Sequence, residues 1–307
     1  MMNESTPNPI VLYLRMVRPL FLMGGILLYA LGAGIAHYLG MDIRWSTYLI
    51  GQLWVSVLQL SAQFLNEYFD VPGDINNQNR TFLTGGSGAL GPGKLPRQTA
   101  LWSALGSLVV LTFITIVMIG EISLPPVAVV IMFLAFLGAI LYSTPPVWLA
   151  ASGYGELTTS IMVSFLLPAF AYVLQTGELH RLLTMTGFPL TGLHMAMLIS
   201  FEMPDYASDI KFNKRTLLIR LGWQAGMNIH NILLLTSFFL LAAAISFGMP
   251  VMIALPAMIP LALALLQIWM MRRIAAGAKP NWNALTINAL AIYVAVAYLL
   301  TFAFWTR

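Results

Sequence analysis

The sequence predicts an all-α polytopic membrane protein with nine transmembrane helices in one bundle around a central cavity. Of its 307 residues, 59% are hydrophobic and only 8% are charged, whereas a soluble domain is about 25% charged. The apolar residues are gathered in nine runs of about 20 residues, the length that an α-helix needs to cross a bilayer. This composition excludes disordered and nucleic-acid-binding classes of protein.

Charge, proline or glycine borders each apolar run. The first run begins after Arg18 and Pro19, the second ends in an acidic group, the third follows Arg97, and the fourth lies between Pro125 and Pro145. The fifth opens at a Gly-Tyr-Gly-Glu segment, the sixth ends in a second acidic group, a Gly-Met-Pro turn divides the seventh from the eighth, and the ninth follows a basic stretch. The predicted spans are 21–40, 47–69, 100–120, 125–142, 156–175, 185–203, 225–247, 251–270 and 284–305.

Lysine and arginine are distributed unevenly between the two ends of this bundle. With the N-terminus inside, the inside segments hold twelve of the 15 basic residues and the outside segments hold three. Because cytoplasmic loops retain positive charge, we expect a bacterial-type cytoplasmic membrane protein with a cytoplasmic N-terminus. Two inside loops are long, about 70–99 and 204–224. Long loops on one face often carry function, so we expect the active site to face the cytoplasm.

Six of the 11 acidic residues form two groups with the same spacing, E-x2-D-x3-D, at an interval of 135 residues. Seven identities within 17 residues suggest a duplicated unit. We therefore expect a single domain, 1–307, with pseudo-repeat halves at roughly 21–142 and 156–270. Four spans separate the copies, so both acidic groups emerge on the same side and can face one another across one cavity. The matched pairs are Glu67/Glu202, Asp70/Asp205, Asp74/Asp209, Ile75/Ile210, Arg80/Arg215, Thr81/Thr216 and Leu83/Leu218.

The acidic groups predict a divalent cation held by Asp70, Asp74, Asp205 and Asp209. Like charges four residues apart on a helix repel one another by about 0.2–0.5 kcal/mol, and the loss of water near hydrocarbon adds to this cost. Oxygen ligands without His or Cys favour Mg²⁺, which takes one or two carboxylates and completes its shell with water and substrate phosphate. The alternative is that these are ordinary solvated charges at helix ends.

Basic residues follow each acidic group. Arg80 stands beyond the first, and Lys211, Lys214 and Arg215 stand beyond the second, where they are placed to meet the rest of a polyphosphate. Lys94 either contacts the same diphosphate or only contributes to the positive charge of the inside loops.

A polar stripe runs along the second span, because Ser56, Gln59, Gln63, Asn66 and Asp70 follow one another in steps of 3 or 4. Such residues share one face of a helix. One interpretation is a cavity wall that hydrogen-bonds a substrate. The other is hydrogen bonding between helices, worth about 0.6 kcal/mol per contact.

Two further features are open to two interpretations each. The glycine-rich stretch 85–94 lacks the ending of a nucleotide-binding loop, and it is either a mobile cap over the site or a flexible connector. His194 lies almost three turns before Asp205 and on the same face of its helix. A single histidine in such a position is more often a packing residue than a functional one.

The motif residues resemble those of a known family. Asn66-Glu-Tyr-Phe-Asp70-Val-Pro-Gly-Asp74 resembles the N-x3-D-x3-D motif of the UbiA-type intramembrane prenyltransferases, and Asp205-Tyr-Ala-Ser-Asp209 resembles their second motif, D-x3-D. The resemblance covers most of the chain and includes Arg18-Pro19, Tyr142-Ser-Thr-Pro-Pro146, Gly153-Tyr-Gly-Glu156 and Lys214-Arg-Thr-Leu-Leu-Ile-Arg-Leu-Gly222.

This resemblance implies a cavity that opens to the cytoplasm and sideways to lipid. Two Mg²⁺ ions would bridge the aspartate motifs, including Asn66, and an isoprenyl diphosphate, with Arg18 and Tyr142 among the substrate-binding residues. Within the family the flanking segments look closer to the menaquinone branch, which prenylates 1,4-dihydroxy-2-naphthoate. This chain has Glu67 where that branch more often has aspartate.

The expected chemistry is ionisation of the isoprenyl diphosphate. Metal ions and cationic side chains that neutralise pyrophosphate as it departs lower the barrier. The faces of aromatic rings, from Tyr68, Phe69, Tyr142 and Tyr206, are placed to stabilise the allylic cation. An electron-rich phenolic ring then attacks this cation and a proton is lost.

Two groups of alternatives remain open at the level of sequence. Internal repeats and intramembrane acids also mark secondary transporters, although transporter sites lie near the bilayer midplane and these acids lie at helix ends. Other acceptors are 4-hydroxybenzoate, a porphyrin, a glycerol lipid, or the chain of the isoprenoid itself in a terpene cyclase.

Overall fold

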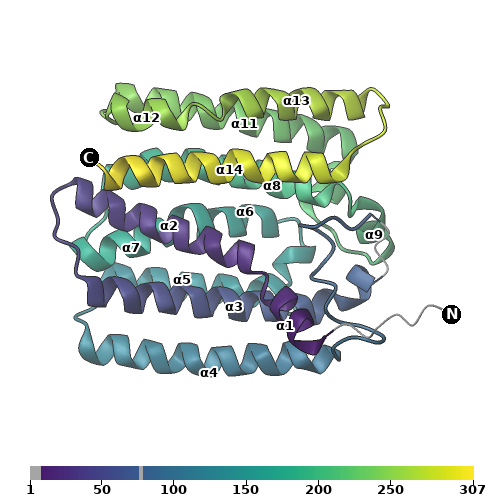
Figure 1. The fold of residues 1–307 in the computed structure, drawn as a ribbon, viewed down its shortest axis with the longest axis horizontal. Coiled ribbons are helices and arrows are strands. Elements are labelled where there is room, and N and C mark those ends of the chain that lie inside the picture. The colour runs from purple at the N-terminus through teal and green to yellow at the C-terminus, as the bar shows by residue number, and fades with distance from the viewer. Residues whose placement is uncertain (1–7, 76–78) are drawn as a thin grey trace.

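The computed structural model describes residues 8–75 and 79–307, and its regular structure in these ranges is helical apart from one isolated bridge between Leu90 and Leu95. Nine segments of the described chain are long and apolar enough to cross a membrane. Figure 1 shows them side by side along the long axis of the molecule, with α4 at one edge and α12 and α13 at the other. The predicted all-α, nine-span architecture of an integral multi-pass membrane protein is confirmed.

The bounds of the elements follow the predicted spans within a few residues. The helices are α1 (Pro9–Val17), α2 (Pro19–Tyr38), α3 (Trp45–Ile75), α4 (Arg97–Glu121), α5 (Pro126–Ser143), η1 (Leu149–Ala151), α6 (Gly155–Ile161), the π-helical η2 (Met162–Leu166), α7 (Leu167–Thr176), α8 (Arg181–Glu202), α9 (Tyr206–Lys211), α10 (Leu217–Leu221), α11 (Trp223–Ser246), α12 (Val251–Ala257), α13 (Leu261–Ala275) and α14 (Trp282–Trp305).

A short helix precedes the first predicted span, and the eighth predicted span is divided into two helices. Arg18 adopts a left-handed conformation (φ 48°) and separates α1 from α2, which Pro19 then opens. Proline suits the first position of a helix because it has no N–H to leave unpaired there. In the eighth span, α12 ends at Ala257 and α13 begins after Pro260, which cannot continue a helix that precedes it.

The second span is longer than predicted, because α3 continues from residue 69 to Ile75 and carries both Asp70 and Asp74. Pro72 lies inside this last part and has no N–H to give to the carbonyl of Tyr68 one turn earlier. Arg97 Nε donates to that carbonyl instead, at 2.8 Å. The side chain that begins α4 therefore satisfies the broken turn of α3. The predicted loop 70–99 is correspondingly shorter, and its residues 76–78 lie outside the described part.

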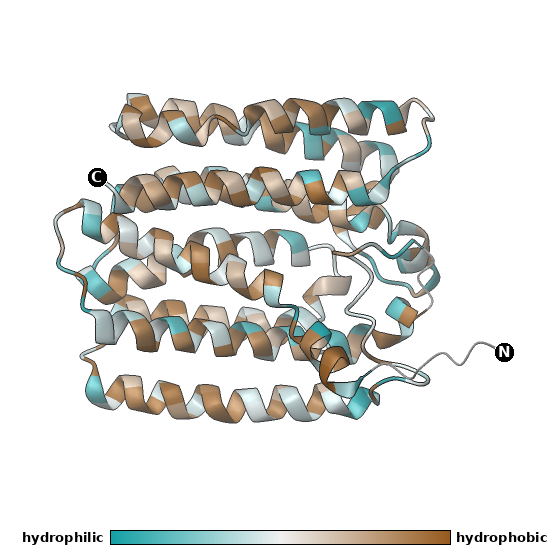
Figure 2. Cartoon of the chain, in the orientation of Figure 1, coloured by the Kyte–Doolittle hydropathy of each residue, from teal (hydrophilic) through white to brown (hydrophobic). Residues whose placement is uncertain are grey.

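Large apolar side chains cover the outside of the bundle. Phe113, Phe133 and Phe239 are each more than half exposed, and Figure 2 shows hydrophobic stretches along the middle of the helices. In water such a surface would be unusual, whereas in a bilayer it contacts lipid. Inside the bundle, Tyr29, Phe170 and Phe304 are among the largest fully buried side chains.

Candidate active site

The two acidic groups lie together at the end of the bundle that carries the long loops (Figure 1). Two contacts join them. Ser208 Oγ donates to the carbonyl of Gly73 at 3.3 Å, and Lys214 Nζ donates to Asp70 Oδ2 at 2.8 Å. Ser208 and Gly73 are 135 residues apart, the same interval that relates the two acidic groups. Equivalent positions of the two groups therefore contact one another directly.

Asp70 is largely enclosed, with a side chain that is 9% exposed. Its Oδ2 accepts hydrogen bonds from Lys214 and from Asn66 Nδ2, the latter at 2.9 Å. Its Oδ1 is buried, and no partner for it is found within the described ranges. A buried carboxylate oxygen without a donor costs free energy unless a cation or a ligand meets it.

Asp74 lies one turn later on α3, against the glycine-rich stretch. Gly86 has φ +72°, and a Cβ added to it would lie 2.1 Å from Asp74 Oδ2. Only glycine therefore fits beside this carboxylate. Arg80 Nη2 donates to the carbonyl of the same Gly86 at 2.9 Å, which places a cation close to this turn.

The second acidic group extends from the end of α8, which holds Glu202, to α9, which holds Asp209. Burial raises the pKa of Asp209 to about 7. The nearby charge of Lys214 opposes this rise, whereas Asp205 and Asp70 add to it. Burial by itself would lower the pKa of Lys214, but Asp70 and Asp209 outweigh burial and raise it well above its usual value. Lys214 is therefore a firmly charged cation among carboxylates.

The candidate ligand atoms suit a hard divalent cation whose remaining coordination positions are filled by water and substrate. All candidate ligands are carboxylate or amide oxygens. No three His, Cys, Asp or Glu side chains converge closely enough to form a complete metal site in the described chain. Mg²⁺ commonly binds through one or two carboxylates with water and substrate phosphate. The open Oδ1 of Asp70 and the crowded carboxylates fit such an ion.

The predicted basic residues fall into two sets. Arg18 and Arg80 lie at the first acidic group, because Arg18 Nη2 donates to the Leu83 carbonyl at 3.0 Å and Arg18 Nη1 lies 3.9 Å from Glu67 Oε1. Burial lowers the pKa of Arg80, while Asp74 and Glu67 oppose this.

Of the three basic residues after the second group, Lys214 turns inward while Lys211 and Arg215 are exposed. The Lys211 ammonium lies 5.8 Å from the centre of the Phe212 ring. The backbone N–H of Arg215 donates to the carbonyl of Ala151 at 3.2 Å. Asn213, with φ 54°, forms the left-handed turn before Lys214, a conformation that asparagine adopts more readily than most residues.

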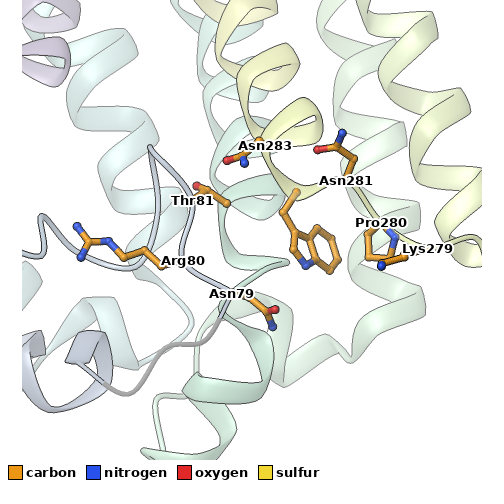
Figure 3. Close-up of a pocket in the computed structure, with 8 residues that line it drawn as sticks. Asn79, Arg80, Thr81, Lys279, Pro280, Asn281 and Asn283 are labelled. Carbon is orange, nitrogen blue, oxygen red and sulfur yellow. The ribbon is translucent and has the colours of Figure 1, made fainter. Parts of the chain in front are cut away.

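Two cavities lie at this end of the molecule. The smaller, of about 300 Å³, is lined by Glu67, Val71, Asp74, Ile75, Arg80, Gly88, Leu90, Gly91, Pro92 and Lys94. The larger, of about 460 Å³, is lined by Asn79, Arg80, Thr81, Lys279, Pro280, Asn281, Trp282 and Asn283. Figure 3 shows the guanidinium of Arg80 directed away from Lys279. Arg80 lines both cavities, and of the two only the smaller includes an aspartate.

The glycine-rich stretch 85–94 packs onto α3. Glu67 is buried, and its carboxylate accepts from Ser87 N at 2.8 Å and from Ser87 Oγ at 2.5 Å. The stretch thus forms one wall of the smaller cavity. No role for Glu67 was predicted from the sequence, although the matching glutamate at position 202 was a signal that this residue type matters in both copies.

The polar side chains of α3 make hydrogen bonds both to a neighbouring helix and within α3, and they leave amide oxygens buried. Gln59 Nε2 donates to the Phe21 carbonyl at 2.7 Å, and Gln52 Nε2 donates to Ser56 Oγ at 3.1 Å. The Oε1 atoms of Gln52, Gln59 and Gln63 are buried, and none has a partner in the residues that the structure describes. Both interpretations of the stripe thus have support.

The aromatic residues near the motifs differ in what they contact. Arg97 covers the ring of Tyr68 at 4.0 Å, and Tyr206 packs edge-on against Trp223 at 5.2 Å. Tyr142 is partly buried and near enough to Lys214 to help raise its pKa. The hydroxyl end of Tyr142 therefore lies within electrostatic reach of Lys214.

His194 is held by packing neighbours deep in the bundle. Its Nδ1 lies 2.9 Å from Ser160 Oγ, and its ring packs edge-on against Tyr293 with 4.9 Å between the centres. These contacts support the packing interpretation.

Comparisons with known proteins agree with this architecture. A family model described as the UbiA prenyltransferase family matches residues 26–285. None of the curated proteins matches the sequence. A UbiA homolog from Archaeoglobus fulgidus, bound to GPP and Mg²⁺, is similar in structure, with a TM-score of 0.66 and 16% identity over 94% of this chain and 99% of that one.

Two other solved structures are similar over nearly their whole length. A digeranylgeranylglyceryl phosphate synthase has a TM-score of 0.60 and 15% identity, over 97% of this chain and 98% of that one. The apo form of a UbiA homolog from Aeropyrum pernix K1 has a TM-score of 0.59 and 11% identity, over 92% of this chain and 96% of that one. At these identities the likeness concerns the fold.

Proposed function

Because this chain belongs to the UbiA prenyltransferase family, we propose that it transfers an isoprenyl group from an isoprenyl diphosphate to an aromatic acceptor, 1,4-dihydroxy-2-naphthoate of the menaquinone pathway. The observation that carries the site assignment is the contact of Lys214 with Asp70, which joins the two acidic groups and leaves Asp70 Oδ1 open. The Gly153-Tyr-Gly-Glu156 and Lys214-Arg-Thr-Leu segments support the choice of acceptor.

We propose that Asp70, Asp74, Asp205 and Asp209 hold two Mg²⁺ ions, with Asn66 orienting Asp70 through their hydrogen bond. Mg²⁺, when bound, supplies positive charge that neutralises pyrophosphate as the allylic C–O bond breaks. Lys214 binds an oxygen of the same diphosphate. Cations fixed in a site that excludes water stabilise developing negative charge without reorganising.

The remaining candidates act around this centre. Arg80 and Lys94 bind or attract the diphosphate from the side of the smaller cavity, and Arg18 does so from beside Glu67. Gln63 hydrogen-bonds the acceptor through its unpaired Oε1. Tyr142 faces the allylic cation with its ring. Lys211 and Arg215, which are exposed, attract the anionic substrate to this end of the molecule.

The orientation that we propose has the N-terminus and the acidic groups on the cytoplasmic side. Twelve of the 15 basic residues lie in segments on that side, as the positive-inside rule requires. A water-soluble diphosphate head group would then approach from the cytoplasm while its chain enters from the lipid.

The experiment that tests this function uses the purified protein in lipid vesicles with an isoprenyl diphosphate and a panel of acceptors. We expect pyrophosphate release and a prenylated product with 1,4-dihydroxy-2-naphthoate. A product only with 4-hydroxybenzoate, a porphyrin or a glycerol lipid would reassign the acceptor. Movement of the diphosphate across the vesicle without pyrophosphate release would favour a transporter.

Removal of the metal ion is expected to stop this reaction. With EDTA in excess, turnover should fall at least about a hundredfold, because the pyrophosphate loses its strongest neutralising charge. Excess Mg²⁺ added afterwards should restore it. Turnover that persists in chelator would contradict the metal-dependent site.

Gly86→Ala is expected to lower turnover about tenfold or more, because its methyl group would displace the Asp74 carboxylate. Gly93→Ala is the matched control, since Gly93 has a similar φ of +69° but no atom within 4 Å of an added Cβ. Both variants bear a similar cost of about 1–2 kcal/mol for alanine in the left-handed region. Equal rates for the two, measured as pyrophosphate release, would contradict a role for the position of Asp74.

A further inference from the structure

Two glutamates that the proposed function does not use converge on the segment just after Lys214. Glu156, near the start of α6, is 5% exposed, and its Oε1 accepts from the N–H of Leu217 at 3.0 Å. Glu202, the last residue of α8, accepts from the N–H of Leu218 through its Oε2 at 3.3 Å. Two carboxyl groups from different spans thus bind consecutive N–H groups at the first turn of α10.

The backbone around Lys214 is tied on both sides. The N–H of Lys214 donates to the Asp209 carbonyl at 2.9 Å, and the N–H of Arg215 donates to the Ala151 carbonyl at 3.2 Å. Thr216 is buried and caps α10. Little freedom is left to the chain from Asp209 to Leu218, and the Lys214 side chain leaves this fixed base to reach Asp70.

The first copy is built in a similar way. Glu67, which matches Glu202, accepts from Ser87 N and Oγ and so holds the stretch that places Gly86 against Asp74 and against Arg80. In both copies the glutamate that opens the acidic group holds the loop that follows, and that loop carries a cation. A buried carboxylate costs free energy even when it is hydrogen-bonded, and an apolar side chain would fill the space more cheaply.

We propose that Glu156 and Glu202 are positioning residues that fix the Lys214 ammonium at the diphosphate site and thereby set the affinity for the isoprenyl diphosphate. A lysine side chain has several rotatable bonds, so an unanchored backbone would spread its ammonium over many positions. The two carboxylates remove this freedom at the base of the side chain. This inference rests on the proposed function, in which Lys214 binds the diphosphate.

Leu217→Pro tests the inference without touching either carboxylate. Leu217 is the first residue of α10, a position that tolerates proline. Thr216 before it has ψ 166° and so lies outside the α region that a following proline disfavours. The substitution removes the N–H that Glu156 binds. We expect KM for the isoprenyl diphosphate to rise about tenfold, as for loss of a hydrogen bond to a charged group, with kcat within about threefold.

Leu217→Ala is the control, because it shortens the same side chain and keeps the N–H. Its KM should stay within about twofold of that of the original chain. Binding is also measured directly, as the stabilisation that the isoprenyl diphosphate gives against thermal unfolding. Equal KM values for the proline and alanine variants would overturn the inference.

A double-mutant cycle separates positioning from general stability. Glu156→Ala should raise KM in the original chain, Glu156→Gln should recover most of that loss because its amide oxygen accepts the same N–H, and Glu156→Ala should cost nothing more in a Lys214→Ala background. If Glu156→Ala raised KM by the same factor in the Lys214→Ala background, the positioning role of Glu156 would be contradicted. The proposed role of Lys214 would stand. An unchanged KM for Lys214→Ala would contradict the proposed role of Lys214 and this inference with it.

Discussion

Asp70→Asn is expected to lower the rate of prenyl transfer at least about a thousandfold, equivalent to about 4 kcal/mol of transition-state stabilisation, while the protein stays folded. Asparagine has nearly the same shape as aspartate, and its oxygen can still accept from Lys214 and Asn66. It lacks the negative charge that a hard cation requires. The measurement is pyrophosphate release by the purified variant in lipid vesicles, together with its melting temperature.

The control for this substitution is Asp42→Asn, the same chemical change at an exposed position between α2 and α3. It should leave turnover within about twofold. Asp205→Asn, at the matched position of the second copy, should resemble Asp70→Asn. A rate for Asp70→Asn within tenfold of the original chain would rule out the carboxylate of Asp70 as a metal ligand.

Lys214→Met is expected to raise KM for the isoprenyl diphosphate about thirtyfold or more and to weaken the ligand-free protein. Methionine keeps much of the length and loses the charge, so Asp70 is left as an enclosed carboxylate with Asn66 as its remaining donor. Losing one member of a buried ion pair costs about 3–5 kcal/mol, and we expect less here because a quarter of the Lys214 side chain is exposed. The melting temperature in EDTA should therefore fall.

Mg²⁺ should reverse this loss of stability, because the ion brings positive charge to the carboxylate that lost its lysine. The gain in melting temperature from EDTA to Mg²⁺ should be larger for Lys214→Met than for the original chain. Lys279→Met, at an exposed lysine at the same end of the molecule, is the control and should behave like the original chain. Equal gains in all three proteins would show that the metal ion does not meet Asp70.

Most of the fold was predictable because the bilayer sets the length of each apolar run, and no soluble alternative could bury so much apolar surface. The predicted end of a helix was wrong where hydropathy does not report which backbone hydrogen bonds are satisfied. The second span was predicted to end at residue 69 because acidic residues follow, but α3 continues to Ile75 and carries Asp70 and Asp74. Pro72 did not end that helix, because Arg97 satisfies the carbonyl that proline leaves free.

The part of the candidate site that follows from the internal repeat, the pair of acidic groups, was predictable from the sequence. The even number of spans between the copies predicted that both acidic groups lie on one side, and the contact of Ser208 with Gly73 joins equivalent positions. Which of three neighbouring basic residues turns inward was not readable, because that depends on the left-handed turn at Asn213 and on distant hydrogen bonds. The loop contacts of Glu156 and Glu202 likewise depend on segments far apart in the chain.

The bond between Lys214 and Asp70 joins residues 144 positions apart, with four complete spans between them. A nascent polypeptide therefore inserts its first acidic cluster long before the lysine that neutralises it has left the ribosome. During that interval Asp70 lacks its cationic partner and must remain hydrated. The bundle can close around this end only when the sixth span has been delivered, so the order of synthesis makes this contact a late step of assembly.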